Sequence, residues 1–239
     1  MSSIEPFIFA SAVREFWRSR GSQASQQAER GVSDQGTRSE VTGGRQMDGF
    51  VRRITELVVA AGVAESSIHT RRRTSELPGY YRPTKGWDIV VVVGGQLLAA
   101  IELKSHVGPS FGNNFNNRIE EATGSAVDIW TAYREGALQS SPQPWLGYLL
   151  LLEDCPESRR PVSVREPHFA VFGEFRGASY AKRYELFCRK LVRERQYTAA
   201  CFIMSDRQRA DLQDNYTEPA EDLSPGAFLS ELIRHVSGR

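Results

Sequence analysis

Two apolar runs joined by a glycine pair constrain this chain more than any other feature of its sequence. Residues 87–104 read WDIVVVVGGQLLAAIELK, and Gly94 and Gly95 separate the two runs. Glycine adopts the positive φ angles of a two-residue hairpin turn, so the segment predicts two antiparallel strands. Neither run alternates between apolar and polar residues, which indicates that both faces of the sheet are covered.

Segments with helical or strand periodicity lie on both sides of this hairpin. The spacing of apolar residues predicts helices at 5–17, 50–61, 117–134, 180–196 and 225–236, and further strands at 145–152 and 198–204. This order predicts an α/β fold with a mixed central β-sheet flanked by helices on both faces. Hydrophobic residues make up 40% of the chain, which is enough for a sizeable core.

Two stretches of the sequence lack this periodicity. Residues 18–46 are rich in Ser, Gln, Gly and Arg, so we expect a flexible polar surface arm there. Residues 1–46 are therefore predicted to form an N-terminal helix with its arm, and residues 47–239 the main domain. Residues 69–86 combine arginines, tyrosines and prolines, and we expect an irregular loop.

The cysteines and the hydropathy pattern bear on the cellular compartment. Cys155, Cys188 and Cys201 form no CxxC pair, which argues against a zinc site or a disulfide framework. The first residues lack the layout of a secretory signal, and no apolar run reaches the roughly 18 residues of a membrane span. We therefore expect a cytoplasmic protein with no membrane segment.

The formal net charge of +1 conceals a polarised distribution of charge. Basic residues dominate between Arg176 and Arg195, whereas acidic residues dominate between Asp206 and Asp222. A basic flank of the helix predicted at 180–196 suits contacts with nucleic acid phosphates. A solvated helix face explains the same flank nearly as well.

The hairpin also brings three charged residues together. Asp88 begins the first strand, and Glu102 and Lys104 end the second, where residues two apart share a face. The turn at the glycine pair returns the chain so that Asp88 lies beside residues 101–103. Charges in an apolar strand pair are unfavourable unless a metal or substrate compensates them. We therefore interpret the cluster as a reactive site, with a structural ion pair as the alternative.

The chemistry of these groups suits hydrolysis of a phosphodiester. The carboxylates of Asp88 and Glu102 and the backbone carbonyl of Leu103 are oxygen donors of the kind that Mg²⁺ prefers. A metal-bound water has a lowered pKa and can attack phosphorus, and Lys104 can orient that water or offset developing charge. The sequence thus predicts Asp88, Glu102 and Lys104 as catalytic residues, and Asp88, Glu102 and Leu103 as metal ligands.

The residues around this cluster resemble a known family. The spacing of Asp88, Glu102 and Lys104 is similar to that of the PD-(D/E)XK nuclease superfamily, although Trp87 stands in place of the proline. Longer segments resemble the XhoI-type restriction endonucleases: LPGYYRPTKGWD (77–88), ELKSHVGPSFGNNFNNRIEEA (102–122), WLGYLLLLEDC (145–155), PHFAVFGEF (167–175) and ASYAKRYELFCRKL (178–191). The similarity runs from about residue 43 to residue 204.

This resemblance implies a homodimeric type II restriction endonuclease that requires Mg²⁺. Its substrate would be double-stranded DNA containing the palindrome CTCGAG, cut on both strands to leave 5′ overhangs. Residues 47–239 would form the nuclease domain with a restriction-endonuclease-like core. Asp88 and Glu102 would bind metal, and Lys104 would orient the attacking water. A DNA methyltransferase of the same restriction-modification system would protect the host's own sites.

Further residues are candidates for contacts with DNA, because Lys and Arg bind phosphates while Asn and Arg can read bases. They are Arg71, Arg72, Arg73, Arg82, Lys85, Asn113, Asn114, Asn116, Asn117, Arg118, Lys182 and Arg183. An ordinary loop at 108–117 explains the asparagines equally well. Glu120 and Glu121 could supply another carboxylate, but the first turn of a helix favours Glu in any case.

Two other functions share much of this pattern. A DNA repair or junction-resolving nuclease of the same superfamily would carry the same three catalytic residues. A DNA-binding module could retain the fold without the chemistry, but it would normally lose one of the three, and all of them stand here. The sequence contains no Walker loop, so ATP-driven cleavage has no support.

Overall fold

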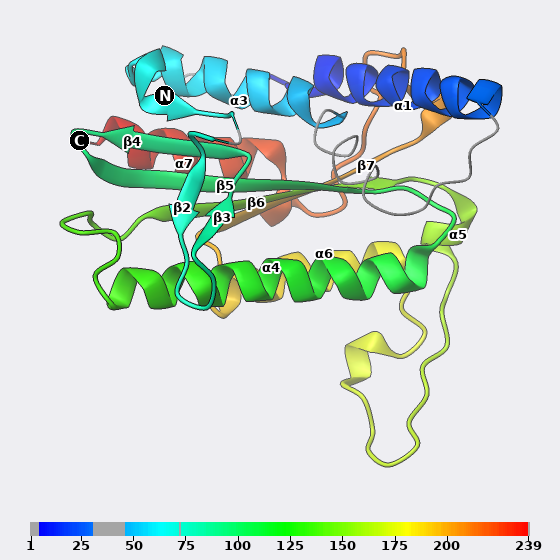
Figure 1. The fold of residues 1–239 in the computed structure, drawn as a ribbon. Helices are drawn as coiled ribbons and strands as arrows, with labels where there is room; N and C mark the ends of the chain where they lie inside the picture. The colour runs from blue at the N-terminus through cyan, green and yellow to red at the C-terminus, as the bar shows by residue number, and fades with distance from the viewer. Residues whose placement is uncertain (1–4, 31–45, 72, 239) are drawn as a thin grey trace.

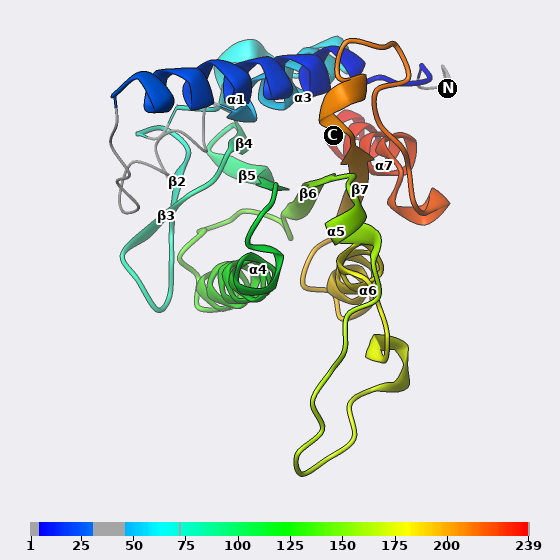
Figure 2. The same cartoon turned by 90° about the vertical axis from the view of Figure 1, so that its right-hand side faces the viewer.

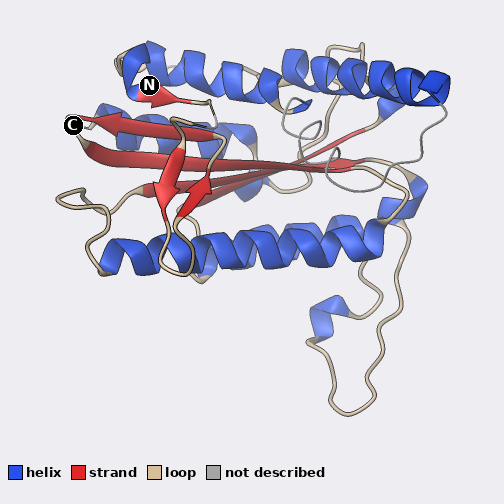
Figure 3. Ribbon diagram, in the orientation of Figure 1, coloured by secondary structure: helices blue, strands red, loops and turns tan. Residues whose placement is uncertain are grey.

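A computed structural model of the chain describes residues 5–30, 46–71 and 73–238 (Figure 1). Its centre is a five-stranded sheet in the order β1-β4-β5-β6-β7. The strands are β1 (Ile68–His69), β4 (Ile89–Val93), β5 (Gln96–His106), β6 (Trp145–Glu153) and β7 (Ala199–Ser205). β1, β4 and β5 pair antiparallel, whereas β5, β6 and β7 pair parallel. The predicted α/β fold with a mixed sheet is confirmed (Figure 3).

The hairpin of β4 and β5 turns at the predicted glycines, whose φ angles are +58° and +78°. Val93 pairs with Gln96 beside the turn, but Ile89 pairs with Ile101 at the far end, so the register shifts by one residue. The shift is a β-bulge at Leu98, which has no counterpart on β4 within the described strands. Nε2 of His235, on the C-terminal helix, donates to the Leu98 carbonyl at 3.2 Å. The bulge decides which side chains of the two strands share a face.

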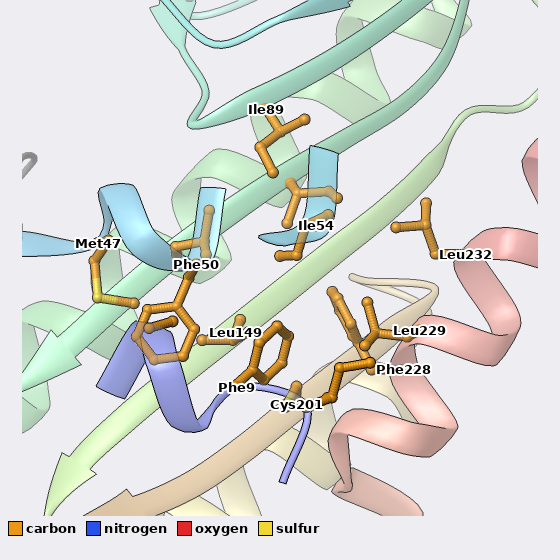
Figure 4. Close-up of a cluster of buried hydrophobic side chains, with 14 of the residues drawn as sticks. Phe9, Met47, Phe50, Ile54, Ile89, Leu149, Cys201, Phe228, Leu229 and Leu232 are labelled. Atoms are coloured by element: carbon orange, nitrogen blue, oxygen red, sulfur yellow. The ribbon is translucent and has the colours of Figure 1, made fainter. Parts of the chain in front are cut away.

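Three helices cover one face of the sheet: α1 (Ala10–Arg30), α3 (Asp48–Ala60) and α7 (Pro225–Ser237) (Figures 1 and 2). Their apolar sides meet the sheet in one core, where Phe9, Phe50 and Phe228 lie together with Leu149 and Cys201 of the strands (Figure 4). Gly62, with a φ of +99°, follows α3. The helix predicted at 50–61 is confirmed, and it begins two residues earlier than its apolar spacing suggests.

The N-terminal helix extends well beyond residue 17, where the sequence predicted a flexible arm to begin. α1 continues to Arg30, and residues 31–45 of the predicted arm lie outside the described residues. Ala, Arg and Gln, which recur in residues 18–30, have high intrinsic helix propensity, so the absence of apolar periodicity did not exclude a helix there. Phe9 and Phe16 are fully buried against α3 and the sheet. The division of the chain at residue 46 stays a prediction.

Two helices cover the opposite face: α4 (Phe111–Arg134) and α6 (Tyr180–Arg193). The sequence placed the start of α4 near Asn117 and a loop before it, whereas the helix begins at Phe111. Phe111 and Phe115 lie one turn apart and pack against Tyr180 of α6. Burial of these two rings favours the helix over the loop that the Asn and Gly content suggested.

A second, two-stranded hairpin stands beside the main sheet, in the stretch that the sequence predicted as irregular. It consists of β2 (Glu76–Pro78) and β3 (Thr84–Gly86), with Leu77 paired to Lys85. Its tip rests on α4, because Asp128 accepts hydrogen bonds from the backbone N–H groups of Tyr80 (2.7 Å) and Tyr81 (2.8 Å). This contact fixes the tip of the hairpin against α4, and Figure 2 shows the hairpin running beside α4 from the level of the sheet.

The remaining elements are short. They are the helix α5 (Pro156–Arg159) and the 3₁₀ turns η1 (Glu65–Ser67), η2 (Gly173–Phe175), η3 (Arg207–Arg209) and η4 (Glu221–Leu223). The segment between α5 and α6 projects away from the sheet, beyond α6, as Figure 2 shows. Within residues 5–30, 46–71 and 73–238, no helix combines the length and apolar character needed to cross a membrane.

Candidate active site

Asp88, Glu102 and Lys104 converge on the face of the sheet that α4 and α6 cover. The N–H of Asp88 donates to the Ile101 carbonyl (3.1 Å), and Oδ2 of Asp88 accepts from the N–H of Leu103 (2.7 Å). These bonds hold Asp88 beside Glu102, as the position of the turn at Gly94 and Gly95 predicted. Nζ of Lys104 lies 3.1 Å from Oε1 of Glu102. The predicted convergence is therefore present, and the bulge at Leu98 makes it possible.

The dependence on the bulge follows from the alternation of side chains along a strand. Without Leu98 as the extra residue, the pairing register beside the turn, in which Val93 pairs with Gln96, would continue along both strands. That register would place Asp88 opposite Ile101. Ile101 points into the core beneath α1 and α3, whereas Glu102 points toward α4. A one-residue slip exchanges the two faces of a strand. The bulge thus puts both carboxylates on one face.

Glu102 lies at the centre of the cluster and is only 3% exposed. Its Oε1 accepts from two ammonium groups, those of Lys104 (3.1 Å) and Lys85 (3.3 Å). Its Oε2 accepts from the hydroxyl of Tyr197, which lies 3.2 Å away. A buried carboxylate is stable only with partners of this kind, because burial alone disfavours the charge. Glu102 is thus held in one position and in its charged form.

The two carboxylates differ in protonation tendency. Burial raises the pKa of Glu102, but the charges of Lys85 and Lys104 outweigh it and leave the pKa below its ordinary value. Burial raises the pKa of Asp88, with the N–H of Leu103 acting against it and the charge of Glu102 adding to it. A cation beside the two carboxylates thus stabilises the charged form of Asp88 more than that of Glu102, which already has two ammonium partners.

The two lysines also differ. Burial lowers the pKa of Lys85, and the attraction of Glu102 only partly offsets this effect. Burial acts in the same direction on Lys104, but Glu102 and Glu121 together raise the pKa of Lys104 above its ordinary value. Lys104 is therefore a firmly charged group, suited to holding a phosphate oxygen or a water in place.

Glu121 belongs to this cluster although the sequence favoured a purely helical role for it. The carboxylate lies on α4, 3.5 Å from Nζ of Lys104 and 2.7 Å from Nη1 of Arg118. Its side chain is 42% exposed, so it lies at the rim of the site. The sequence placed it in a first helical turn, whereas the earlier start of α4 puts it further inside the helix. The Glu121 carboxylate therefore faces Lys104 and the cluster around Glu102, and not the helix terminus.

The donor set suits a hard divalent cation with a partly aqueous coordination shell. No cluster of three or more His, Cys, Asp or Glu side chains with metal-binding geometry occurs in the described part of the chain. Asp88 and Glu102 supply two carboxylates, and the carbonyl of Leu103, the residue after Glu102 in β5, is a third oxygen. Mg²⁺ binds proteins through one or two carboxylates and keeps several waters, so such a set fits it.

The predicted DNA-contacting residues fall into two groups. Arg71 and Arg73 are exposed, as are Asn113, Asn116 and Asn117, and Arg72 lies outside the described residues. The asparagines stand on the first turns of α4 and not on a loop, which corrects the sequence-based placement. Asn114 on the same turns is half-buried. Their role in binding DNA stays a prediction.

The other candidates already have partners inside the protein. Arg82 donates to Asp128 (2.6 Å), Arg118 to Glu121 (2.7 Å) and Lys182 to Glu185 (2.8 Å). Arg183 donates to the backbone carbonyls of Ala178 and Val162, at 3.1 Å each. Lys85 points to Glu102. These side chains remain partly accessible, Lys85 least of all at 12%, so a phosphate contact stays a prediction for each.

Sequence reasoning missed two residues that shape the site. Tyr197 follows α6 and is 1% exposed, and its distance from Glu102 in the sequence hides the contact. Asp128 lies on the buried side of α4 and anchors the tip of the hairpin that carries Lys85. An acidic residue among the apolar positions of α4 was the one available signal for Asp128. No pattern in the sequence singles out Tyr197.

His106 was left without a role by the sequence, and the structure gives it a structural one. It ends β5, is 2% exposed, and its Nδ1 lies 2.6 Å from the hydroxyl of Tyr184. Its ring packs on that of Phe111. Burial, and secondarily the charge of Arg118, lower the pKa of His106 to about 4, so the imidazole is neutral at neutral pH.

Comparison with known proteins gives one consistent result. A family profile described as restriction endonuclease XhoI matches residues 26–218. The type II restriction enzyme BstVI of Geobacillus stearothermophilus is 57% identical over 209 residues, which cover 85% of this chain and 92% of BstVI.

Two further type II restriction enzymes are similar along most of their length. XhoI of Xanthomonas vasicola is 52% identical over 181 residues, covering 75% of this chain and 72% of that protein. AbrI of Azospirillum brasilense is 49% identical over 158 residues, covering 66% and 71%. No solved structure matches the chain.

Proposed function

Because this chain belongs to the restriction endonuclease XhoI family, we propose that it is a type II restriction endonuclease that cuts both strands of double-stranded DNA at a short palindrome. The observation that carries the proposal is the convergence of Asp88, Glu102 and Lys104 on one face of the β4–β5 hairpin. A core that served only for packing would not place two carboxylates and two ammonium groups together in an apolar sheet.

The residues of the cluster have distinct tasks in this proposal. Asp88 and Glu102, with the Leu103 carbonyl, would hold Mg²⁺, which when bound supplies a water of lowered pKa and neutralises phosphate charge. Lys104 orients the water and offsets the charge that develops on the phosphate oxygens. Tyr197 fixes Glu102 through Oε2. Asp88 stays deprotonated next to a cation despite its raised pKa.

The specificity and the assembly follow from the family resemblance. We propose CTCGAG as the recognised palindrome, with cleavage that leaves 5′ overhangs. A palindrome has two equivalent half-sites, so a two-fold homodimer allows each subunit to read one half and cut one strand. A methyltransferase that modifies the same sequence would protect the host DNA. Enzyme and methyltransferase would both act on DNA in the bacterial cytoplasm.

A second nuclease function is less well supported. A repair or junction-resolving enzyme would use the same three catalytic residues, but the similarity to three type II restriction enzymes extends over most of the described chain. An inactive DNA-binding module is also disfavoured, because all three residues are present, with Lys104 in contact with Glu102 and Asp88 hydrogen-bonded to the neighbouring backbone N–H of Leu103.

The proposal can be tested by digesting two plasmids that differ only in a single CTCGAG site. We expect linearisation of the plasmid with the site in Mg²⁺, no cutting in EDTA, and no cutting of the plasmid without the site. Lys104→Ala should lose cleavage but still bind the DNA. Metal-dependent cutting of both plasmids would retain the nuclease and reject the specificity, and no cutting with any divalent ion would reject the nuclease.

A further inference from the structure

Lys85 is a second lysine at the catalytic centre, and it comes from outside the strand pair that carries Asp88, Glu102 and Lys104. Its Nζ lies 3.3 Å from Oε1 of Glu102, the same atom that Lys104 contacts at 3.1 Å. The Lys85 side chain is 12% exposed. It is therefore part of the interior of the site and not a mobile side chain on the surface.

The fold fixes the position of Lys85 in two ways. Its Nζ lies 4.1 Å from the centre of the Trp87 ring, a buried ring that attracts a cation through its face. Its backbone belongs to β3, paired with β2, and the tip of this hairpin is hydrogen-bonded to Asp128. The ammonium group is thus presented to Glu102 by a hairpin whose tip is anchored to α4.

The position of Lys85 affects how well Glu102 can bind a divalent cation. Oε1 of Glu102 already carries two positive partners, and like charges repel strongly in a buried site. A divalent cation at this carboxylate therefore competes with Lys85. Lys104 is held independently by Glu121 on α4, at 3.5 Å, whereas no second carboxylate contacts Lys85 within the described residues. The other contacts of the Lys85 ammonium group are with uncharged groups, the Gly86 carbonyl at 3.1 Å and the Trp87 ring, so Lys85 is the partner that can turn from Glu102 to a nearby phosphate.

A DNA phosphate offers Lys85 another acceptor. A phosphodiester brought to Lys104 for cleavage also comes close to Lys85, because both ammonium groups touch one oxygen atom. Its negative charge can replace that of Glu102 as the partner of Lys85. Glu102 then regains an oxygen for the metal. Each ligand would thus strengthen the binding of the other, as reciprocal linkage requires.

We propose that Lys85 makes divalent metal binding at Glu102 depend on DNA: its ammonium group competes with the metal in the free protein and moves to a phosphate when DNA binds. The inference rests on the proposed function, since DNA is the ligand that releases Lys85. It makes Lys85 a residue that positions Glu102 and controls metal affinity, in addition to the three residues expected to perform the chemistry.

The test is a calorimetric titration of the full-length protein with Ca²⁺ in the presence and absence of a duplex containing CTCGAG. Lys85→Met removes the charge and keeps the chain length. Lys190→Met is the matched control, because Nζ of Lys190 also pairs with a carboxylate (Glu174, 2.8 Å) and lies over two rings, Phe172 (5.1 Å) and Phe175 (5.4 Å), away from the site.

Without DNA, we expect Lys85→Met to bind Ca²⁺ about tenfold more tightly than the wild type and the control to be unchanged. With DNA, the affinities of wild type and Lys85→Met should converge.

Two results would overturn the proposal. An unchanged or weaker Ca²⁺ affinity of Lys85→Met without DNA would reject the competition, and a gap that persists with DNA would reject the release. Lys85→Gln, with the same charge change and a polar head, guards against misfolding of the Met variant. Because the titration without DNA needs no cleavage, a failed plasmid digestion would reject the nuclease and leave the competition at Glu102 to be judged separately.

Discussion

Tyr197 and Glu102 lie 95 residues apart in the sequence, yet the buried hydroxyl of Tyr197 donates to Oε2 of Glu102 at 3.2 Å. The same hydroxyl lies 3.2 Å from the Ala122 carbonyl on α4. The loop after α6 thus meets β5 and α4 at a single oxygen atom. Glu102 is held from the side opposite to its two lysines, which restricts the rotamers of its carboxylate.

The Tyr197→Phe variant should therefore cleave DNA about tenfold more slowly, because Glu102 loses the donor that fixes one of its oxygens. A hydrogen bond to a charged group contributes roughly 1.5–3 kcal/mol, so the free energy of unfolding should fall as well. Tyr148→Phe is the control. Its ring packs beside that of Tyr197, and its hydroxyl has no hydrogen-bond partner among the described residues. Single-turnover rates equal for both variants would remove Tyr197 from the positioning of Glu102.

Asp128→Ala should loosen the β2–β3 hairpin. The variant removes the acceptor of three hydrogen bonds, from Tyr80, Tyr81 and Arg82, in a carboxylate that is 3% exposed. We expect a loss of roughly 2–3 kcal/mol in urea unfolding and faster chymotrypsin cleavage at the two exposed tyrosines.

Asp222→Ala provides the comparison for that experiment. Like Asp128, Asp222 accepts several hydrogen bonds, two from Arg189. Its side chain is 57% exposed, however, so the expected loss of unfolding free energy is below about 1 kcal/mol. Equal losses in the two variants would show that the contact of Asp128 with the hairpin tip contributes no special stability.

Gly79→Ala should disturb the same tip by crowding. An added Cβ would lie 2.6 Å from the Arg82 carbonyl oxygen and 2.7 Å from Oδ2 of Asp128, closer than such atoms can approach. We expect a loss of roughly 1–3 kcal/mol. Gly86→Ala, on the same hairpin, meets no atom within 4 Å and should change stability by less than about 0.5 kcal/mol. An unchanged melting temperature of Gly79→Ala would mean that the hairpin tip shifts to make room for the added Cβ without loss of stability.

Asp88→Asn should separate stability from activity. The pKa of Asp88 is raised, so its charged form destabilises the fold, and this cost develops as the pH rises above the ordinary value of 3.8. We expect the variant to unfold at a higher temperature than the wild type at pH 7, with a difference that shrinks toward pH 4. Its cleavage rate should fall at least about a hundredfold. A variant less stable than the wild type at pH 7 would contradict the raised pKa.

His106 should contribute to the loss of stability in acid. Its folded pKa of about 4 lies below the ordinary 6.5, so the unfolded chain takes up a proton first as the pH falls between these values. Stability should therefore decline from pH 6.5 to 4 in the wild type. In His106→Phe, the slope of unfolding free energy against pH should be smaller over this range. Parallel slopes would show that the buried imidazole titrates normally.

The sequence was most informative where local chemistry decides the structure. The apolar runs around the two glycines predicted β4 and β5, and residue spacing predicted that Asp88 would meet Glu102 and Lys104. The bulge at Leu98 was not predicted, because an extra residue in an apolar run changes neither composition nor turn signals. The sequence therefore predicted correctly that Asp88 and Glu102 share a face of the sheet, but it did not predict the bulge that causes this.

The parts of the site that come from distant segments could not be predicted. The sequence placed Lys85 among the candidates for DNA contact because lysine binds phosphates. The hairpin that carries it was not predicted, because β2 and β3 are three residues each and lie in a stretch with turn-forming residues. Its contact with Glu102 depends on the hairpin tip resting on Asp128, which is a tertiary interaction. The early start of α4 has a similar cause, since Phe111 and Phe115 are stabilised by Tyr180 of another helix.

The bulge at Leu98 has a consequence for how this site tolerates changes in chain length. A single insertion or deletion in the paired part of β4 or β5 shifts the register by one residue and turns one of the two carboxylates to the opposite side of the sheet, whereas a change of two residues returns it. Residues added at the turn, beside Gly94 and Gly95, lie outside the paired strands and only lengthen the loop. The shared face of Asp88 and Glu102 therefore depends on whether the number of residues in the paired strands is odd or even. Enzymes with longer or shorter versions of these strands should differ there in steps of two, which the residue types alone would never reveal.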